Sequence, residues 1–109
     1  MKTIKFTPEL TELIKKGEKT TTFRLFNDKN LSSGDRVILA TRDGKKVTNF
    51  AGAKLLNVYT KPIKKLNEED YVGHEPVENP IEDYKKYYSN KITENTEVKI
   101  IRFEIKKFL

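Results

Sequence analysis

The chain has 109 residues, 36% hydrophobic and 35% charged, and a formal net charge of +6, which fits one small domain with one core over residues 1–109. It has no cysteine, which excludes disulfides, thiolate catalysis and cysteine-ligated zinc. Because it also has no signal-peptide pattern and no apolar run near the roughly 18 residues of a membrane span, we expect a soluble, cytoplasmic protein that contacts no membrane.

The first predicted element is a short helix. Thr7-Pro8-Glu9 combines an N-cap residue, a proline at the first helical position and an acid in the first turn. Leu10, Leu13 and Ile14 then follow at helical spacing, and Gly17 is placed to end the helix.

Strand-forming residues dominate the next segment. Thr20–Phe26 is rich in β-branched and aromatic residues and predicts a strand, followed by a polar loop over residues 27–34. Residues 36–41 predict a buried strand. Asp43-Gly44 is a hairpin signal, and Val47–Tyr59 is the expected return strand.

The C-terminal half predicts two helices and a strand. Ile63–Tyr71 is expected to form a short helix that stops at Gly73, and Asn79-Pro80 is expected to start another. Glu97–Phe108 predicts a long last strand. Its apolar positions change phase at Ile100-Ile101, where we expect a β-bulge.

The order of these elements predicts the fold class. Gly52, inside an expected strand, indicates a bulge or bend of the kind that small barrels need. One helix, three strands, two helices and a final strand predict an α+β fold, a small twisted β-barrel edged by short helices.

Charge is unevenly distributed along the chain. Residues 1–65 carry 15 Lys and Arg against 6 Asp and Glu, whereas residues 66–83 carry seven acids and no Lys or Arg. A basic body favours a polyanion such as RNA, through phosphate neutralisation and counterion release. The alternative is that lysine simply occupies solvated faces, because no basic block is longer than two residues.

Two familiar site types do not fit the sequence. Gly17-Glu18-Lys19-Thr20 lacks the upstream glycine of a phosphate loop and precedes a strand rather than a helix. His74 is the only histidine, so a multi-histidine metal site is excluded, and no serine has the context of a Ser-His-Asp triad. We expect neither metal nor cofactor.

Four segments together resemble the ASCH family. Residues 17–24 (GEKTTTFR) match its G-x-K-T-x-T-x-R opening, and Ser33-Gly34-Asp35 matches the glycine–aspartate turn before a hydrophobic strand. Gly73-His74-Glu75 matches the G-H-E element, and Val98–Ile105 is similar to the last strand. The resemblance lies in their order and spacing, and it implies a PUA-like β-barrel whose cleft is associated with RNA or nucleoside ligands.

Some small bacterial members of this family hydrolyse the acetyl amide of N4-acetylcytidine. The resemblance implies Lys19, Thr22 and Glu75 as the catalytic residues. Thr22 could attack the acetyl carbonyl if Lys19 were neutral enough to accept its proton, or Glu75 could serve as the base for water or protonate the leaving nitrogen. Because Lys19 lies at a helix-to-strand junction, we expect its side chain to be exposed to the cleft.

Arg24, Thr20 and His74 are the predicted substrate-binding residues. The guanidinium of Arg24 suits a planar or anionic group, although an ion pair with Asp28 or Asp35 is an equal alternative. His74 is expected to orient the neighbouring glutamate or to pack in a loop.

Tyr84, Tyr87 and Tyr88 could stack on bases, although the helical spacing of Tyr84 and Tyr88 also fits core packing. The sequence thus carries two main hypotheses, beside a weaker third, a regulator that binds a modified nucleotide and signals through a partner. The first is an amidohydrolase acting on an acylated cytosine nucleoside, and the alternative is a PUA-like module that binds RNA without chemistry.

Overall fold

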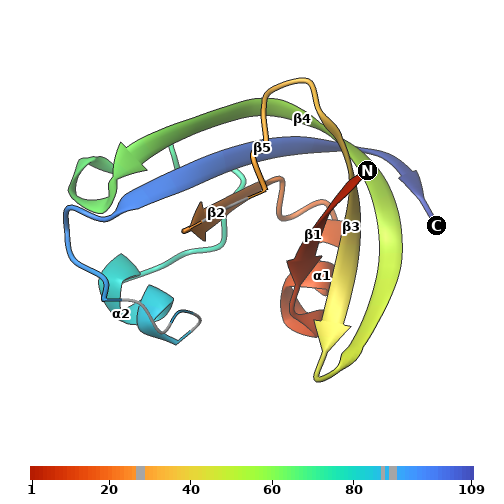
Figure 1. The fold of residues 1–109 in the computed structure, drawn as a ribbon, viewed down its shortest axis with the longest axis horizontal. Coiled ribbons are helices and arrows are strands. Elements are labelled where there is room, and N and C mark those ends of the chain that lie inside the picture. Colours follow the sequence, from red (N-terminus) through yellow and green to blue (C-terminus); the bar gives the residue numbers. More distant parts are fainter. Residues whose placement is uncertain (27–28, 87, 89–90) are drawn as a thin grey trace.

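Five strands form one curled sheet in the order β1-β3-β4-β5-β2 in the computed structural model, which describes residues 1–26, 29–86, 88 and 91–109 (Figure 1). The strands are β1 (Lys2–Phe6), β2 (Thr21–Leu25), β3 (Arg36–Asp43), β4 (Lys46–Pro62) and β5 (Glu97–Phe108). The helices are α1 (Pro8–Lys15), the single 3-10 turn η1 (Ile63–Lys65) and α2 (Pro80–Lys85). None of the helices described is long and apolar enough to cross a bilayer.

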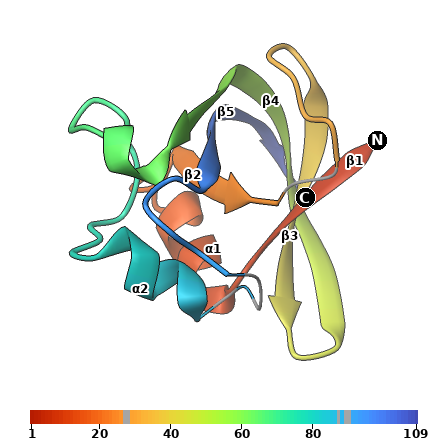
Figure 2. The ribbon, with the colours of Figure 1, turned by 60° about the vertical axis from the view of Figure 1, so that its left-hand side comes forward.

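The sheet curls far enough to bring its two edges toward each other. The edge strands are β1 and β2, and α1, which connects them in sequence, lies across the opening between them (Figure 2). The long strands β4 and β5 carry most of the curvature. The predicted α+β fold with a twisted sheet and short flanking helices is therefore confirmed.

Local capping signals explain α1 and α2. The hydroxyl of Thr7 accepts a hydrogen bond from the backbone N–H of Leu10, as predicted for an N-cap. Gly17 has φ +79°, the left-handed conformation that ends helices. In α2, the side chain of Asn79 accepts from the backbone N–H of Glu82, which confirms the predicted start.

The strand β1 was not expected, since the predicted elements begin with the helix. Its residues alternate in burial, with Ile4 and Phe6 facing the core, and it pairs in parallel with β3. The sheet therefore gains an edge strand that lines the site described below.

The predicted helix over residues 63–71 is wrong beyond its first turn. Leu66 leaves the helical region, with ψ 139°. The side chain of Asn67 then accepts hydrogen bonds from two downstream backbone amides, and the buried carboxylate of Asp70 accepts from the backbone N–H of Asn67 at 2.9 Å. These side-chain acceptors replace the helical hydrogen bonds with a compact turn.

The β-bulge predicted at Ile100-Ile101 is also wrong, because both residues pair in regular register with β2. Both are buried, but they belong to different core clusters. The buried face of β5 therefore changes from one side of the strand to the other between these two residues. The β4–β5 register shifts between Leu55 and Asn57 instead. A second shift adjoins Gly52, which confirms the irregularity expected there.

Candidate functional site

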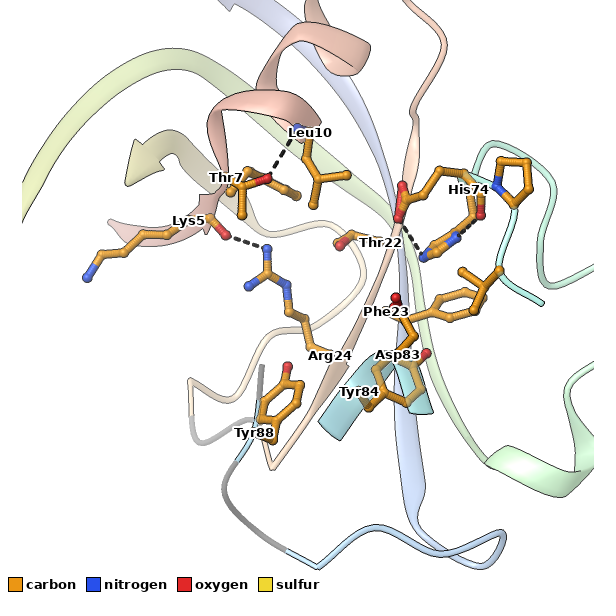
Figure 3. Close-up of a pocket in the computed structure, with 14 residues that line it drawn as sticks. Lys5, Thr7, Leu10, Thr22, Phe23, Arg24, His74, Asp83, Tyr84 and Tyr88 are labelled. Atoms are coloured by element: carbon orange, nitrogen blue, oxygen red, sulfur yellow. Dashed lines mark hydrogen bonds and ion pairs between the residues drawn. The ribbon is translucent and has the colours of Figure 1, made fainter. Parts of the chain in front are cut away.

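A cleft opens between the two edge strands of the sheet (Figure 3). Its lining residues are Lys5, Phe6, Thr7 and Leu10 at the β1–α1 junction, Thr22, Phe23 and Arg24 in β2, residues 74–77, and Asp83, Tyr84 and Tyr88. The site therefore forms where the curled sheet leaves its edges unpaired, and it combines charged and aromatic side chains.

An ion pair between Lys19 and Glu75 adjoins this cleft. The Nζ atom of Lys19 donates to Oε2 of Glu75 at 2.7 Å, to Oε1 at 3.0 Å, and to the backbone carbonyl of Thr21 at 2.8 Å. The two charged residues are 56 positions apart in sequence. Burial lowers the pKa of Lys19 below its usual range, while the charge and hydrogen bonds of Glu75 oppose that shift.

The expected exposure of Lys19 is wrong. Its side chain is only 1% exposed, whereas that of Glu75 is 24% exposed and lines the cleft. Lys19 is buried because a carboxylate and a backbone carbonyl together satisfy its ammonium group. Glu75 is therefore the member of the pair that a ligand in the cleft would touch.

His74 holds Glu75 from the other side. Its Nδ1 atom lies 2.7 Å from the backbone oxygen of Glu75, and its Nε2 atom lies 3.1 Å from Oε1 of the same residue. The imidazole ring stacks on Phe23 at a centroid distance of 4.1 Å. Because a backbone carbonyl can only accept, Nδ1 carries the hydrogen, and Nε2 of the neutral ring is free to accept one from a protonated Glu75.

The remaining predicted residues divide between the cleft and other surfaces. Thr22 is 4% exposed and lines the cleft, and its hydroxyl makes no hydrogen bond to any other described residue. Arg24 donates from Nη2 to the backbone carbonyl of Lys5, so it bridges β2 to β1, and its Nε atom has no partner in the part of the chain described. Thr20 is exposed and does not line the cleft, and its backbone instead pairs with Gly73 and Phe103.

The structure also bears on the alternative ion pairs of Arg24 and on the packing of the tyrosines. Arg24 forms no ion pair with Asp35, which lies 3.9 Å from Lys2, while Asp28 and Tyr87 lie outside the described residues. Tyr84 is 7% exposed and packs in a core cluster, and Tyr88 accepts a hydrogen bond from Leu25. Within the described residues, no group of three or more acidic, histidine or cysteine side chains is arranged to hold a metal ion.

Solved structures resemble this chain, although no family model and no curated protein matches its sequence. A protein of family DUF984 from Enterococcus faecalis matches with a TM-score of 0.72 and 18% identity over 93% of this chain and 72% of its own. A single-residue mutant of the ASCH protein from Zymomonas mobilis matches with a TM-score of 0.71 and 16% identity, over 97% of this chain and 68% of its own. The hypothetical protein PH0355 matches with a TM-score of 0.69 and 23% identity, over 96% of this chain and 99% of its own. The chain has an ASCH-type fold. The predicted fold, a small twisted β-barrel edged by short helices, is thereby confirmed.

Within this ASCH-type fold, Gly73 fixes the position of Glu75. Gly73 has φ +81°, and its carbonyl accepts from the backbone N–H groups of Thr20 at 2.8 Å and Thr21 at 3.0 Å. A Cβ atom at Gly73 would lie 2.2 Å from the Thr20 hydroxyl and 3.0 Å from that of Thr21, which is itself bonded to the carbonyl of Val72. The glycine thus permits the close approach that presents Glu75 to Lys19.

We expect Gly73→Ala to destabilise the protein by about 2–4 kcal/mol, because it combines a left-handed backbone with a steric collision. Gly44→Ala is the matched control, since Gly44 also has positive φ but faces open space. Its cost should be about 1 kcal/mol. Urea unfolding of both variants measures the difference, and equal losses would contradict the proposed close approach.

The pH dependence of stability should report on His74. Burial and the charge of Lys19 lower the pKa of His74 in the folded protein. As the pH falls, the imidazole of the unfolded chain is therefore protonated before that of the folded protein. The contribution of His74 to the free energy of unfolding is present above about pH 6.5 and is lost as the pH falls below that value. Urea unfolding at pH 7.5 and 5.5 should show less stability at the lower pH, and His74→Gln should lose less over this interval. An unchanged pH dependence in His74→Gln would contradict the assignment.

Proposed function

We propose that this protein is a cofactor-free amidohydrolase that removes the acetyl group from N4-acetylcytidine or a related acylated nucleoside. The observation that carries the proposal is the buried Lys19–Glu75 pair, whose carboxylate faces a cleft shared with Thr22. The ASCH-type fold and the matching motifs support the choice of substrate.

Glu75 is the proposed general base. Its carboxylate takes a proton from a water molecule as the water oxygen attacks the acetyl carbon. The resulting tetrahedral intermediate collapses, the bond between that carbon and N4 breaks, and the proton passes from Glu75 to N4. Acetate and cytidine leave, so that one water molecule is consumed for each amide cleaved.

The neighbours of Glu75 support both of its protonation states. The ammonium group of Lys19 stabilises the carboxylate before the reaction, through contacts of 2.7 and 3.0 Å. After proton transfer, Nε2 of His74, 3.1 Å away, can accept a hydrogen bond from the protonated carboxyl group. Lys19 and His74 together therefore allow Glu75 to take up and release a proton without moving.

Thr22 has a different proposed role from that of a nucleophile activated by Lys19. Its hydroxyl has no hydrogen bond to Lys19 or Glu75, although it lines the cleft. It is therefore placed to donate a hydrogen bond to the acyl oxygen, where negative charge develops during the attack. Intact-protein mass spectrometry during turnover distinguishes the two roles, because only the nucleophile route gives an acetylated protein.

A planar base fits the walls of the cleft. Phe23 and Tyr84 supply aromatic surface, and the guanidinium of Arg24, which lies 4.8 Å from the ring centroid of Phe6, can contact a ring face or an exocyclic oxygen. Burial lowers the pKa of Arg24, but arginine remains charged in proteins.

The test is chromatography of N4-acetylcytidine after incubation with purified protein, in parallel with RNA binding measured across salt concentrations. Deacetylation supports the enzyme. The net charge of +6 favours the alternative, an RNA-binding module, and binding that weakens steeply with salt in a protein inert toward every acylated cytosine would establish that alternative instead.

A further inference from the structure

A second hollow adjoins the cleft on the far side of Arg24. Lys5, Arg24 and Tyr88, which Figure 3 shows in the cleft, line both spaces and form the wall that they share. Four of the residues lining this hollow are cationic, namely Lys5, Arg24, Lys29 and Arg42, and none of its described lining residues is acidic.

These cations come from separate parts of the chain. Lys5 lies in β1, Arg24 in β2 and Arg42 near the end of β3, and the curled sheet brings them to one rim. Arg42 is exposed and has no ion pair with another described residue. The buried Nε atom of Arg24 lacks a hydrogen-bond partner in the same part of the chain. The hollow therefore offers positive charge to an anion.

An exposed aromatic residue completes the hollow. Phe26 is 49% exposed, has φ +51°, and meets Tyr88 edge to face at 5.7 Å. A large apolar side chain in a left-handed conformation at the surface is unusual, and its exposed ring provides a stacking surface.

We propose that this hollow binds the phosphate group attached to the nucleoside in the cleft. The substrate is then an acylated cytidine nucleotide, either free or within an RNA, and the inference on the acyl group rests on the proposed function. The base and acyl group occupy the cleft beside Glu75, and the ribose passes Arg24 so that its phosphate meets Lys5 and Arg42. Phosphate is the anion that a set of arginine and lysine side chains recognises best beside a nucleoside.

Binding of unacylated ligands tests the phosphate site without any need for catalysis. We expect cytidine 5′-monophosphate to bind more tightly than cytidine in calorimetric titrations, with a difference that shrinks as salt is added. Arg42→Gln should weaken binding of the nucleotide about two- to fivefold and so reduce its advantage over cytidine. Arg36→Gln is the matched control, since Arg36 is an exposed arginine of the same strand that does not line the hollow, and it should keep the full difference.

The outcomes separate this proposal from the proposed function. Equal affinities for cytidine and its monophosphate, or equal effects of the two arginine variants, would overturn the phosphate site even if N4-acetylcytidine is hydrolysed. A phosphate preference that depends on Arg42, in a protein without deacetylase activity, would support the site and reject the enzyme. A cytidine-containing trinucleotide resolves the source of the phosphate, because tighter binding than the monophosphate indicates RNA and weaker binding indicates a free nucleotide.

Discussion

Replacing Glu75 with glutamine is expected to lower the rate of N4-acetylcytidine deacetylation by about 10²–10⁴-fold, the usual contribution of a general acid–base residue. Glutamine keeps the size of the side chain but cannot take a proton from water. It also removes the charge that pairs with Lys19, so the measurement includes circular dichroism to show that the variant is folded. Initial rates over a range of substrate concentrations give kcat and KM.

Two further variants make this result specific. Glu78→Gln changes an exposed glutamate three residues downstream that does not line the cleft, and it should leave the rate unchanged. Glu75→Asp keeps a charge for Lys19 but moves the carboxylate by one methylene, and it should retain more stability than activity. A Glu75→Gln variant within tenfold of the wild-type rate would remove Glu75 from the role of base.

Lys19→Met is expected to impair both stability and activity. Methionine replaces most of the buried volume, but the carbonyl of Thr21 loses its donor and Glu75 loses its counter-charge. Breaking a fully buried ion pair costs about 3–5 kcal/mol. Because water reaches Glu75, which is 24% exposed, we expect a smaller loss of about 1–3 kcal/mol in the free energy of unfolding.

Urea unfolding and the deacetylation assay measure the two effects of Lys19→Met. Deacetylation should fall close to background, since Glu75 loses the ammonium group that holds its carboxylate in place. Lys16→Met, at an exposed lysine next to the same helix end, should change neither property. A Lys19→Met variant as stable and as active as the wild type would show that the pair has no role in either.

Elements set by local hydrogen bonds could be predicted from the sequence. Thr7-Pro8 and Asn79-Pro80 mark helix starts because their caps bond within three residues, and Asp43-Gly44 marks a hairpin because only a few residues suit its turn. The strand β1 was not predicted, although its sequence has the alternating pattern of a strand, with Ile4 and Phe6 buried. That pattern is a local signal from which the strand could have been predicted.

Features set by distant contacts could not be predicted in the same way. Lys19 is buried because its partner lies 56 positions away, and no local pattern distinguishes it from the solvated lysines nearby. Asp70 is similar, since its carboxylate is buried by contacts with Tyr59 and Lys61 from β4. A turn stabilised in this way replaces most of the helix that was expected over Ile63–Tyr71.

The residues of the cleft show the same difference between what the local sequence predicts and what distant contacts decide. The motif resemblance selected Thr22, Arg24 and Glu75, and the structure places these three on one cleft. It also selected Thr20, which precedes β2, is exposed and does not line that cleft, because its backbone pairs with Gly73 and Phe103. The part played by Lys5, whose carbonyl holds Arg24 across the sheet edges, depends on the strand that was missed.

The central claim is hydrolysis of an acetylated cytosine by this cleft, and its most direct test is a reaction of N4-acetylcytidine with excess wild-type protein in ¹⁸O-labelled water. The account predicts cytidine and acetate in equal amounts, with one ¹⁸O atom from water in each acetate. N4-acetylcytidine that remains intact after prolonged incubation with folded protein would contradict it.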